Sequence, residues 1–170
     1  PDSEFPVAEI IGALDSTDTG LGKTICALTY AFTISMKYEQ SDIAYKILII
    51  VPNHIKHHWN NELSKHFNIP DPARYITIID YTEAREYSID DFAKYSELIC
   101  DEIHEMYSNV GNVNRSLFNK LVSCKSFKKR WAISATPFVD EESLFHLVRY
   151  LVRLPNGADI THPSAGTSSI

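Results

Sequence analysis

The amino-acid sequence predicts an α/β fold of three layers, with a parallel β-sheet flanked by helices on both faces. Three observations support this prediction. Short apolar runs alternate along the chain with helical patterns of about ten residues or more. The run at 46–51 is apolar and rich in β-branched residues, which is typical of a strand covered on both faces. Polar motifs follow the expected strands, at the sheet edge where α/β proteins bind ligands.

The first part of the chain leads from a weak pattern into a helix and a strand. Residues 1–13 could form a short helix or a strand that leads into the following loop. From residue 23 to about 38, apolar residues recur at helical spacing, which predicts a helix with one apolar face. A turn at 40–42 separates this helix from the strand expected at 46–51, which Pro52 ends.

A second helix and a second apolar run come next. Asn53 is suited to cap a helix that runs to about Phe67. The apolar face of that helix is made by Ile55, Trp59, Leu63 and Phe67. Prolines mark a loop at 68–72, and the second apolar run is at 75–79. Residues 80–93 are polar and mixed, and we expect a turn and a short helix there.

The last part of the chain repeats the alternation. Two further strands are expected at 98–100 and 131–134, and two further helices at 112–122 and 141–151. From Pro155 the composition changes to Gly, Ser, Thr and Pro. We therefore expect 155–170 to be a disordered tail or the remnant of a domain boundary.

A glycine-containing stretch at 17–24 carries the strongest chemical signal. Glycine has no Cβ, so the backbone N–H groups of such a turn can approach a phosphate. A helix that starts at Lys23 or just before it would add the positive end of its dipole. The Lys23 ammonium could reach phosphates, and the Thr24 hydroxyl could bind Mg²⁺. The strict pattern has glycine where this sequence has Thr17, and a chance Lys-Thr pair after a turn is the alternative.

Two carboxylates follow the strand expected at 98–100. Asp101 could hold Mg²⁺ opposite Thr24, and Glu102 could orient or deprotonate a water molecule that attacks a phosphate. Adjacent carboxylates at a strand end are otherwise typical of a solvated turn. The glycine-containing stretch upstream favours the functional interpretation.

Hydroxyl groups follow the strand expected at 131–134. Ser134 and Thr136 could hydrogen-bond to the carboxylates at the neighbouring strand end. The tetrapeptide at 134–137 carries little information by itself. The order and spacing of the three motifs together are more informative.

Taken in order, residues 19–24, 101–104 and 134–136 resemble motifs I, II and III of superfamily 2 helicases. Val51 and Pro52, with Trp59 and Glu62, are similar to motif Ia of the Swi/Snf-type ATPases. The stretch 135–138 and the helix expected after it are also similar to that group. The spelling of motif II, with Ile103 and His104, lies nearer to the DEAH-like boxes of helicases. The resemblance covers about residues 12–152.

This resemblance implies a P-loop NTPase lobe of the RecA-like type, a helicase ATP-binding domain at 1–154 that binds ATP and Mg²⁺. It implies a Walker A motif whose nucleotide contacts are Thr19, Gly20, Leu21, Gly22, Lys23 and Thr24. It implies catalytic roles for Lys23, Asp101 and Glu102, and Mg²⁺ contacts for Thr24 and Asp101. It also implies that His104, Ser134 and Thr136 couple hydrolysis to the motion of a nucleic acid.

The implied activity is ATP hydrolysis by the first motor lobe of a nucleic-acid-dependent ATPase, a helicase or DNA translocase. The implied partners are a nucleic acid, with DNA favoured over RNA, and a second RecA-like lobe that this sequence lacks. We therefore expect the isolated lobe to be weakly active or inactive. The glutamine that reads adenine in many members of the superfamily has no counterpart in 1–13.

Two other functions stay open at this point. One is a non-motor, regulatory ATP-binding module, against which the intact Lys23, Asp101 and Glu102 argue. The other is a P-loop enzyme of another class, such as a small-molecule kinase. The hydroxyl motif at 134–136 and the lack of an evident lid argue against it.

Composition limits these possibilities further. The 170 residues are enough for one domain with a full core. The longest apolar run is far too short for a membrane span, so we expect no membrane contact. Cysteines without a close pair favour an intracellular protein, in the nucleus or the cytoplasm. A net charge of −6 does not favour a grip on nucleic acid through overall positive potential. The cations Lys125, Lys128, Lys129 and Arg130 are interpreted as a solvated loop rather than a DNA contact.

Cysteines and histidines give weaker signals. Cys26, Cys100 and Cys124 are too far apart in sequence for a CxxC site, and we expect buried, reduced thiols. His54, His57 and His58 could face one way, but a polar helix face is favoured over a metal site.

Overall fold

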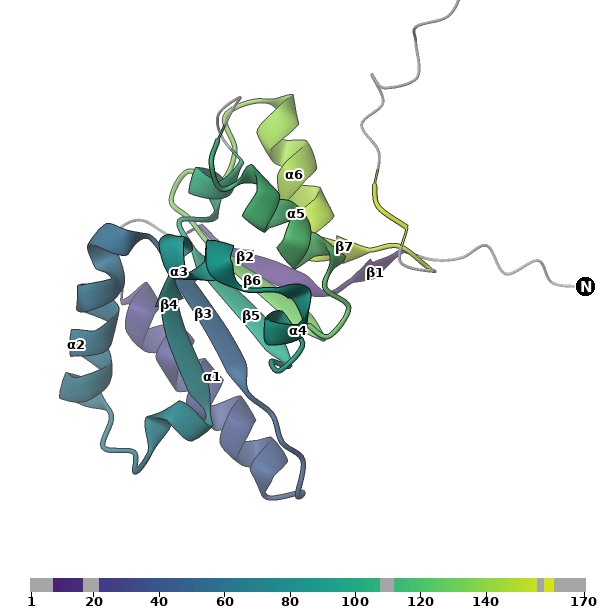
Figure 1. The fold of residues 1–170 in the computed structure, drawn as a ribbon. Helices are drawn as coiled ribbons and strands as arrows, with labels where there is room; N and C mark the ends of the chain where they lie inside the picture. Colours follow the sequence, from purple (N-terminus) through teal and green to yellow (C-terminus); the bar gives the residue numbers. More distant parts are fainter. Residues whose placement is uncertain (1–7, 17–21, 108–111, 156–157, 161–170) are drawn as a thin grey trace, which may run out of the picture.

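The computed structural model describes residues 8–16, 22–107, 112–155 and 158–160. Its centre is a parallel sheet of five strands in the order β2-β6-β5-β3-β4 (Figure 1). These strands are β2 (Gly12–Asp15), β3 (Ile47–Val51), β4 (Ile76–Asp80), β5 (Glu97–Asp101) and β6 (Lys129–Ile133). All four neighbouring pairs are parallel, so the strands end at one common edge.

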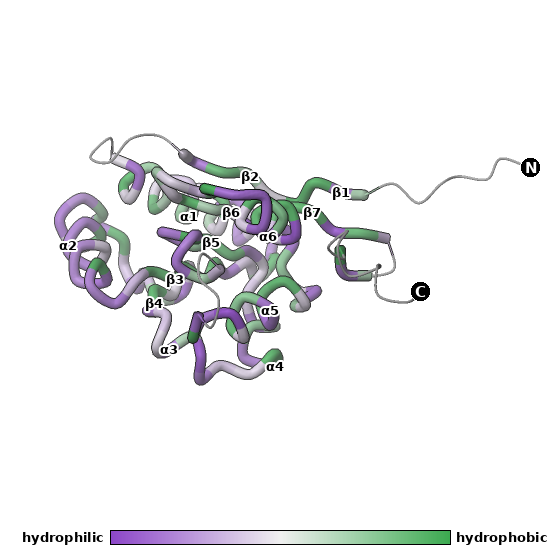
Figure 2. Tube along the Cα trace, turned by 90° about the horizontal axis from the view of Figure 1, so that it is seen from above, coloured by the Kyte–Doolittle hydropathy of each residue, from purple (hydrophilic) through white to green (hydrophobic). Residues whose placement is uncertain are grey.

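Helices cover both faces of the sheet, which confirms the predicted three-layer α/β fold. One layer contains α1 (Lys23–Glu39) and α2 (Lys56–His66), and the other contains α3 (Tyr81–Glu86), α4 (Ile89–Phe92), α5 (Arg115–Ser123) and α6 (Glu141–Leu151). Figure 2 shows that α2 is mostly hydrophilic. Its buried Trp59 nevertheless packs into the core on the α1 side of the sheet.

Strand β3 is buried on both faces of the sheet, which explains why polar residues do not alternate with apolar ones in its sequence. All five of its residues are buried. Leu48 and Ile50 belong to the core beneath α3–α6, whereas Ile47, Ile49 and Val51 belong to the core beneath α1 and α2. Because successive side chains point to opposite faces, a strand in the middle layer needs apolar residues at every position.

The chain contains smaller elements that the sequence pattern does not reveal. The short strands β1 (Glu9–Ile10) and β7 (Val152–Arg153) form an antiparallel pair beside the main sheet (Figure 1). The described residues also contain the 3₁₀ turns η1 (Asn53–Ile55), η2 (Pro72–Arg74) and η3 (Ile103–Met106). In the described part of 1–13, strands β1 and β2 resolve the open choice between helix and strand in favour of strand.

Asn53 does not cap α2, contrary to the prediction. The turn η1 comes between them, and Ile55 is the capping residue of α2, without a side-chain hydrogen bond. The Asn53 amide instead donates to Thr82 Oγ1 at 2.6 Å, at the start of α3. The side chain therefore ties the α2 side of the molecule to α3.

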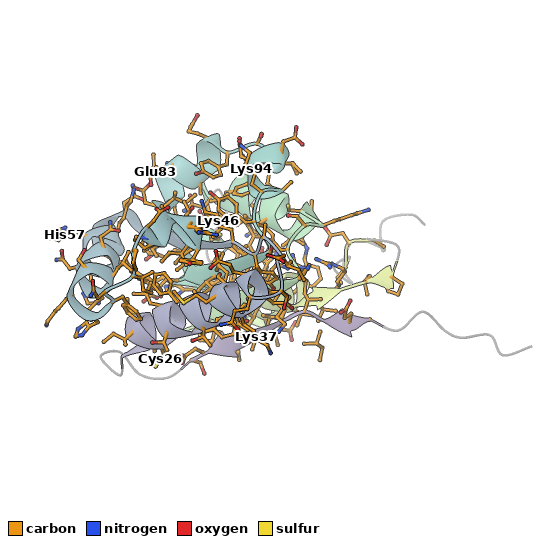
Figure 3. All side chains as sticks on the ribbon, turned by 90° about the horizontal axis from the view of Figure 1, so that it is seen from below. Cys26, Lys37, Lys46, His57, Glu83 and Lys94 are labelled. Carbon is orange, nitrogen blue, oxygen red and sulfur yellow. The ribbon has the colours of Figure 1, made fainter. Side chains whose placement is uncertain are left out.

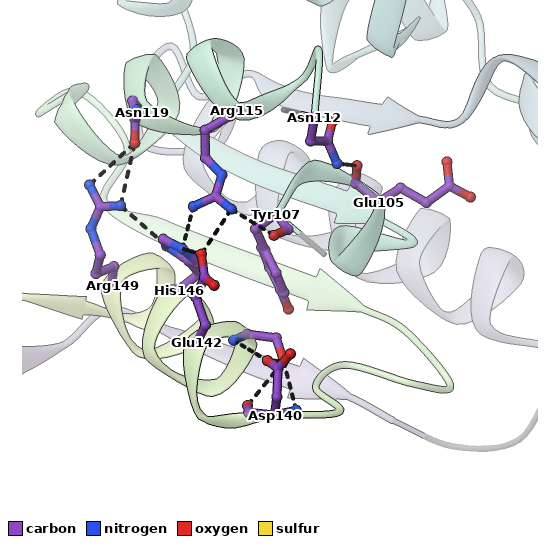
Figure 4. A network of polar contacts seen from close by, with 10 residues as sticks. Glu105, Tyr107, Asn112, Arg115, Asn119, Asp140, Glu142, His146 and Arg149 are labelled. Atoms are coloured by element: carbon purple, nitrogen blue, oxygen red, sulfur yellow. Dashed lines mark hydrogen bonds and ion pairs between the residues drawn. The ribbon is translucent and has the colours of Figure 1, made fainter. Parts of the chain in front are cut away.

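A polar network holds α6 against α5 and the chain after η3 (Figure 4). Arg115 of α5 donates to His146 Nε2 and to the Tyr107 carbonyl, the second at 2.9 Å. Its guanidinium also lies 3.3 Å from Glu142 Oε1. Arg149 Nη1 lies 3.3 Å from His146 Nδ1, so both ring nitrogens of this buried histidine face an arginine.

A buried carboxylate ties α1 to the sheet near the start of β5. Glu97 is 1% exposed and accepts hydrogen bonds from Tyr30, Tyr45 and Trp131. Three donors on one carboxylate offset much of the cost of burying it. This cluster lies at the amino end of the strand whose other end carries Asp101.

Candidate nucleotide-binding site

The candidate site lies where β2, β6 and β5 end side by side. Asp15 of β2 is paired with Ile133 of β6, and Ile133 is paired with Asp101 of β5. Ser134 follows β6, and Glu102 follows β5. Parallel pairing thus brings two of the three sequence motifs to adjacent strand ends, where open α/β sheets bind ligands.

The third motif enters through the start of α1. The helix begins at Lys23, and Gly22 precedes it with φ 76°, a left-handed conformation that favours glycine. Lys23 and Thr24 are half-buried in the first turn. The predicted nucleotide contacts Thr19, Gly20 and Leu21 lie outside the described residues.

Asp101 is held by two donors. Its Oδ2 accepts from the Trp59 indole N–H at 2.9 Å, and its Oδ1 accepts from the Glu102 backbone N–H at 2.9 Å. Burial raises the pKa of this carboxyl, whereas the Trp59 hydrogen bond and the positive charge of Lys23 act in the opposite direction. The carboxylate is therefore fixed in orientation near a cation, as a metal-binding group requires.

Glu102 has an uncommon backbone conformation. Its φ is 49°, in the left-handed region that a non-glycine residue adopts at an energetic cost. The Tyr81 hydroxyl donates to the Asp101 carbonyl and, at 3.0 Å, to the Glu102 carbonyl. This buried tyrosine supports the turn at the end of β5.

His104 and Ser134 connect the two strand ends. Ser134 Oγ lies 2.7 Å from His104 Nδ1, which in turn lies 3.4 Å from Glu102 Oε2. Ser134 is fully buried, and its Oγ also accepts from the Thr136 backbone N–H at 3.1 Å. Thr136 itself is exposed, and its hydroxyl has no hydrogen bond within the described part of the chain.

Sequence reasoning did not find two residues that build this site, Tyr81 and Tyr107, and it placed a third, Trp59, only in motif Ia and on the apolar face of its helix. Trp59 and Tyr81 hold Asp101 and Glu102, as described above. The Tyr107 hydroxyl donates to the Pro137 carbonyl at 2.5 Å and joins the segment after η3 to the loop after β6. A buried aromatic residue with a polar atom needs a hydrogen-bond partner, and that need was the available signal.

The other candidate residues do not form a metal site. His54, His57 and His58 are exposed, and His57 lies on the outer side of α2 (Figure 3). The residues described here contain no cluster of three or more His, Cys, Asp or Glu suited to a metal ion. All three cysteines are free, and Cys100 and Cys124 are buried as expected. Cys26 is exposed on α1, so the expectation of burial was wrong for that residue.

Solved structures with similar folds come from helicase-type ATPases. The UvsW helicase from bacteriophage T4 aligns with a TM-score of 0.60 at 14% identity, over 84% of this chain and 52% of that one. The Sulfolobus solfataricus SWI2/SNF2 ATPase core in complex with dsDNA aligns with a TM-score of 0.58 at 21% identity, over 83% of this chain and 31% of that one. The fold of this chain is thus one that is also found in helicase and SWI2/SNF2 ATPase cores.

The chain belongs to the SNF2-related domain family, whose model matches residues 9–93. It is 24% identical to the protein CHROMATIN REMODELING 25 of Arabidopsis thaliana, over 84% of this chain and 18% of that protein. It is 22% identical to the DNA repair and recombination protein RAD54 of Oryza sativa subsp. japonica, over 83% of this chain and 17% of that protein. The chain thus spans less than a fifth of the length of these relatives.

Every helix in the described ranges is too short or too polar to cross a membrane.

Proposed function

We propose that this chain is the first motor lobe of a nucleic-acid-dependent ATPase that binds and hydrolyses ATP. The observation that carries the proposal is the arrangement of Lys23, Asp101 and Glu102. Lys23 opens α1 and its charge acts on Asp101, which β5 places beside the end of β6. Membership of the SNF2-related domain family supports the same function.

The residues divide the work in a definite way. The backbone of 19–22 and the Lys23 ammonium bind phosphates, while Thr24 and Asp101 hold Mg²⁺. The bound Mg²⁺ would neutralise phosphate charge during hydrolysis. Glu102 accepts the proton of the attacking water, because its half-exposed side chain follows directly after the fixed Asp101. Through their contacts with Glu102 and with each other, His104 and Ser134 couple changes at the nucleotide site to the loop after β6.

The proposed partner is DNA, together with a second RecA-like lobe. RAD54 is named as a DNA repair protein, and the Sulfolobus ATPase core was solved with dsDNA. Closure of two lobes on ATP would move the protein along its track. We propose an intracellular location, in the nucleus or the cytoplasm, and a domain at 1–154 followed by a boundary segment at 155–170.

Purified full-length protein tests the proposal. We expect Lys23→Ala to abolish ATP binding and turnover, because it removes a charge-assisted phosphate contact. Glu102→Gln should keep ATP affinity but lower turnover about a hundredfold or more, the scale of a lost general base. Wild-type turnover by Lys23→Ala would contradict the assignment of the nucleotide site.

Stimulation by DNA separates this function from the other two. A motor lobe predicts ATP turnover that rises when double-stranded DNA is added to the full-length protein. A regulatory module would bind ATP without such stimulation. A P-loop enzyme of another class would transfer phosphate to a small molecule and ignore DNA. RNA in a parallel reaction tests the preference for DNA.

A further inference from the structure

A cavity lies at the opposite end of the sheet from the strand-end site. Its volume is about 710 Å³. It is bordered by the end of α5, the start of β6, the β1–β7 pair and residues 158–160. Its charged lining consists of Glu9, Lys125, Arg130, Arg149, Arg153 and Asp159. A cavity of this size is in the range of small-molecule sites.

Arg130 is the unusual member of this lining. The residue was expected in a solvated loop, but it is only 1% exposed, in the second position of β6. Its Nη1 donates to the Val122 carbonyl at 3.1 Å, and its guanidinium carbon lies 5.6 Å from the centre of the Tyr150 ring. Among the described residues, its Nε has no hydrogen-bond partner and no carboxylate lies within ion-pair distance of the guanidinium.

The charge of Arg130 is therefore only partly compensated. Burial lowers the pKa of its guanidinium to about 10, so the group still carries its charge at neutral pH. A buried charge without an ionic partner destabilises a fold, and one Tyr ring and one carbonyl replace only part of its hydration. An anion in the cavity would supply the missing partner.

The neighbouring charges leave the cavity positive. Arg149 is already paired with Asp159, with Nη2–Oδ2 and Nε–Oδ1 distances of 2.5 and 3.0 Å. Arg153 donates to the Phe127 carbonyl, and no carboxylate of the described residues pairs with it. Lys125 adds a further, exposed cation, and Glu9 is the remaining carboxylate of the lining. Among the described residues of the lining, three cations without an ion pair therefore face one such carboxylate, Glu9, which lies opposite Arg153 in the β1–β7 pair.

We propose that this cavity binds the phosphate group of a small molecule, with Arg130 as its buried anchor and Arg153 and Lys125 as supporting cations. A dianionic phosphate matches an excess of two positive charges, and a guanidinium offers it parallel N–H donors. Arg130 lies three residues before the end of β6, about 10 Å along the strand from the nucleotide edge. The phosphate proposed here is therefore distinct from those of ATP.

Calorimetric titration with inorganic phosphate tests this site on the full chain, in chloride buffer of constant ionic strength. The strand-end site could also bind phosphate, so the titration is repeated with Lys23→Ala. In this variant we expect phosphate binding at the cavity beside Arg130 to persist. Arg130→Met should weaken that binding at least tenfold. Lys129→Met, an exposed neighbour on the same strand, is the matched control and should bind normally.

Folding and ligand source are controlled separately. In phosphate-free buffer, Arg130→Met should melt no lower than wild type, since it replaces a poorly compensated charge with an apolar side chain. Lys125→Ala lies at the exposed rim and should weaken phosphate binding several-fold without affecting folding. Free phosphate and a sugar phosphate, titrated in turn, show whether the cavity takes the ion alone or a larger ester.

Two outcomes would overturn the proposal. One is phosphate binding that disappears in Lys23→Ala and persists unchanged in both Arg130→Met and Lys125→Ala, because the only phosphate site would then be the nucleotide edge. The other is an absence of binding for both phosphate compounds at millimolar concentration while an oligonucleotide binds through Arg130. The cations would then form a nucleic-acid contact.

Discussion

At the scale of single residues, the indole N–H of Trp59 is the least expected part of the strand-end site. It reaches from α2 to a carboxylate 42 positions further along the chain. Asp101 is buried and its pKa is raised by that burial, so each donor to its carboxylate matters for the charged form. Trp59 is therefore a positioning residue for the proposed Mg²⁺ contact.

Trp59→Phe tests this role because it keeps the ring and removes the donor. We expect a loss of about 1.5–3 kcal/mol in the free energy of unfolding, the range for hydrogen bonds to charged groups. We also expect ATP turnover to need a higher Mg²⁺ concentration for half-saturation. Urea unfolding and a Mg²⁺ titration of ATPase activity measure the two effects.

Trp131→Phe is the matched control, since Trp131 donates to the buried carboxylate of Glu97 at 3.0 Å. It should lose a similar amount of stability but keep the Mg²⁺ dependence of the wild type. Equal Mg²⁺ dependence in both variants would show that Trp59 only stabilises the fold.

The Ser134 hydroxyl is predicted to couple the strand ends. Ser134→Ala removes its contact with His104, and no proposed phosphate or Mg²⁺ contact is lost. We expect ATP affinity within a few-fold of wild type and a lower ratio of DNA-stimulated to basal turnover. The resemblance implies the same role for Thr136, but its hydroxyl is exposed and has no hydrogen bond in the described residues, so we expect Thr136→Ala to keep that ratio. A lower melting temperature with an unchanged ratio would mean that Ser134 only stabilises the loop.

At the scale of secondary-structure elements, β2 lies so close to β6 at Gly12 that no side chain fits there. A Cβ at Gly12 would lie 1.7 Å from the Arg130 carbonyl oxygen. Gly12→Ala should therefore push β2 away from its partner and cost about 1–3 kcal/mol, the usual range for overpacking. Chemical denaturation measures this loss. Ala13→Ser at the exposed next position is the control, and it should unfold like wild type.

The contact between α5 and α6 should make stability depend on pH. Burial, together with the nearby charges of Arg115 and Arg149, lowers the pKa of His146 below its ordinary 6.5, although Glu142 acts in the opposite direction. Below pH 6.5, His146 is protonated in the unfolded chain but stays neutral in the folded protein until a lower pH. The free energy of unfolding should thus fall as pH falls, by up to about 1.4 kcal/mol per pH unit.

Replacing the histidine isolates its share of the pH dependence. His146→Gln should flatten the fall in stability between pH 6.5 and 5 in urea unfolding experiments. His54→Gln, at an exposed position of η1, should retain the wild-type profile. A profile that is the same in all three proteins would assign the pH dependence to other groups.

At the scale of the whole molecule, the sequence predicted the layers of the fold better than its edges. The apolar runs that became β3, β4, β5 and β6 are long enough to be recognised, and the strand ends then followed from parallel pairing. Strand β2 has only four residues, including Gly12 and Asp15, so periodicity could not separate it from a helix. The pair β1–β7 depends on contacts between opposite ends of the domain.

The positions of the motif residues in the candidate site could be predicted from the sequence, whereas the hydrogen bonds that hold them could not. Strand ends could be located from local pattern, so the neighbouring positions of Asp101 and Ser134 could be expected. The bonds from Trp59 and Tyr81 arise from packing between distant segments, which no local pattern encodes. Arg130 was misinterpreted for a similar reason, because its basic neighbours are typical of solvent-exposed chain.

The pairing of β1 with β7 has a mechanical consequence. Glu9 lies opposite Arg153 and Ile10 opposite Val152, so both outer ends of the ribbon point the same way. Tension between the two ends of the domain would separate β1 from β7 starting at the outer end, so that their hydrogen bonds break one after another. The parallel strands of the main sheet would instead have to slide past one another. A pulling force would thus peel off the ribbon first and leave the strand-end site intact.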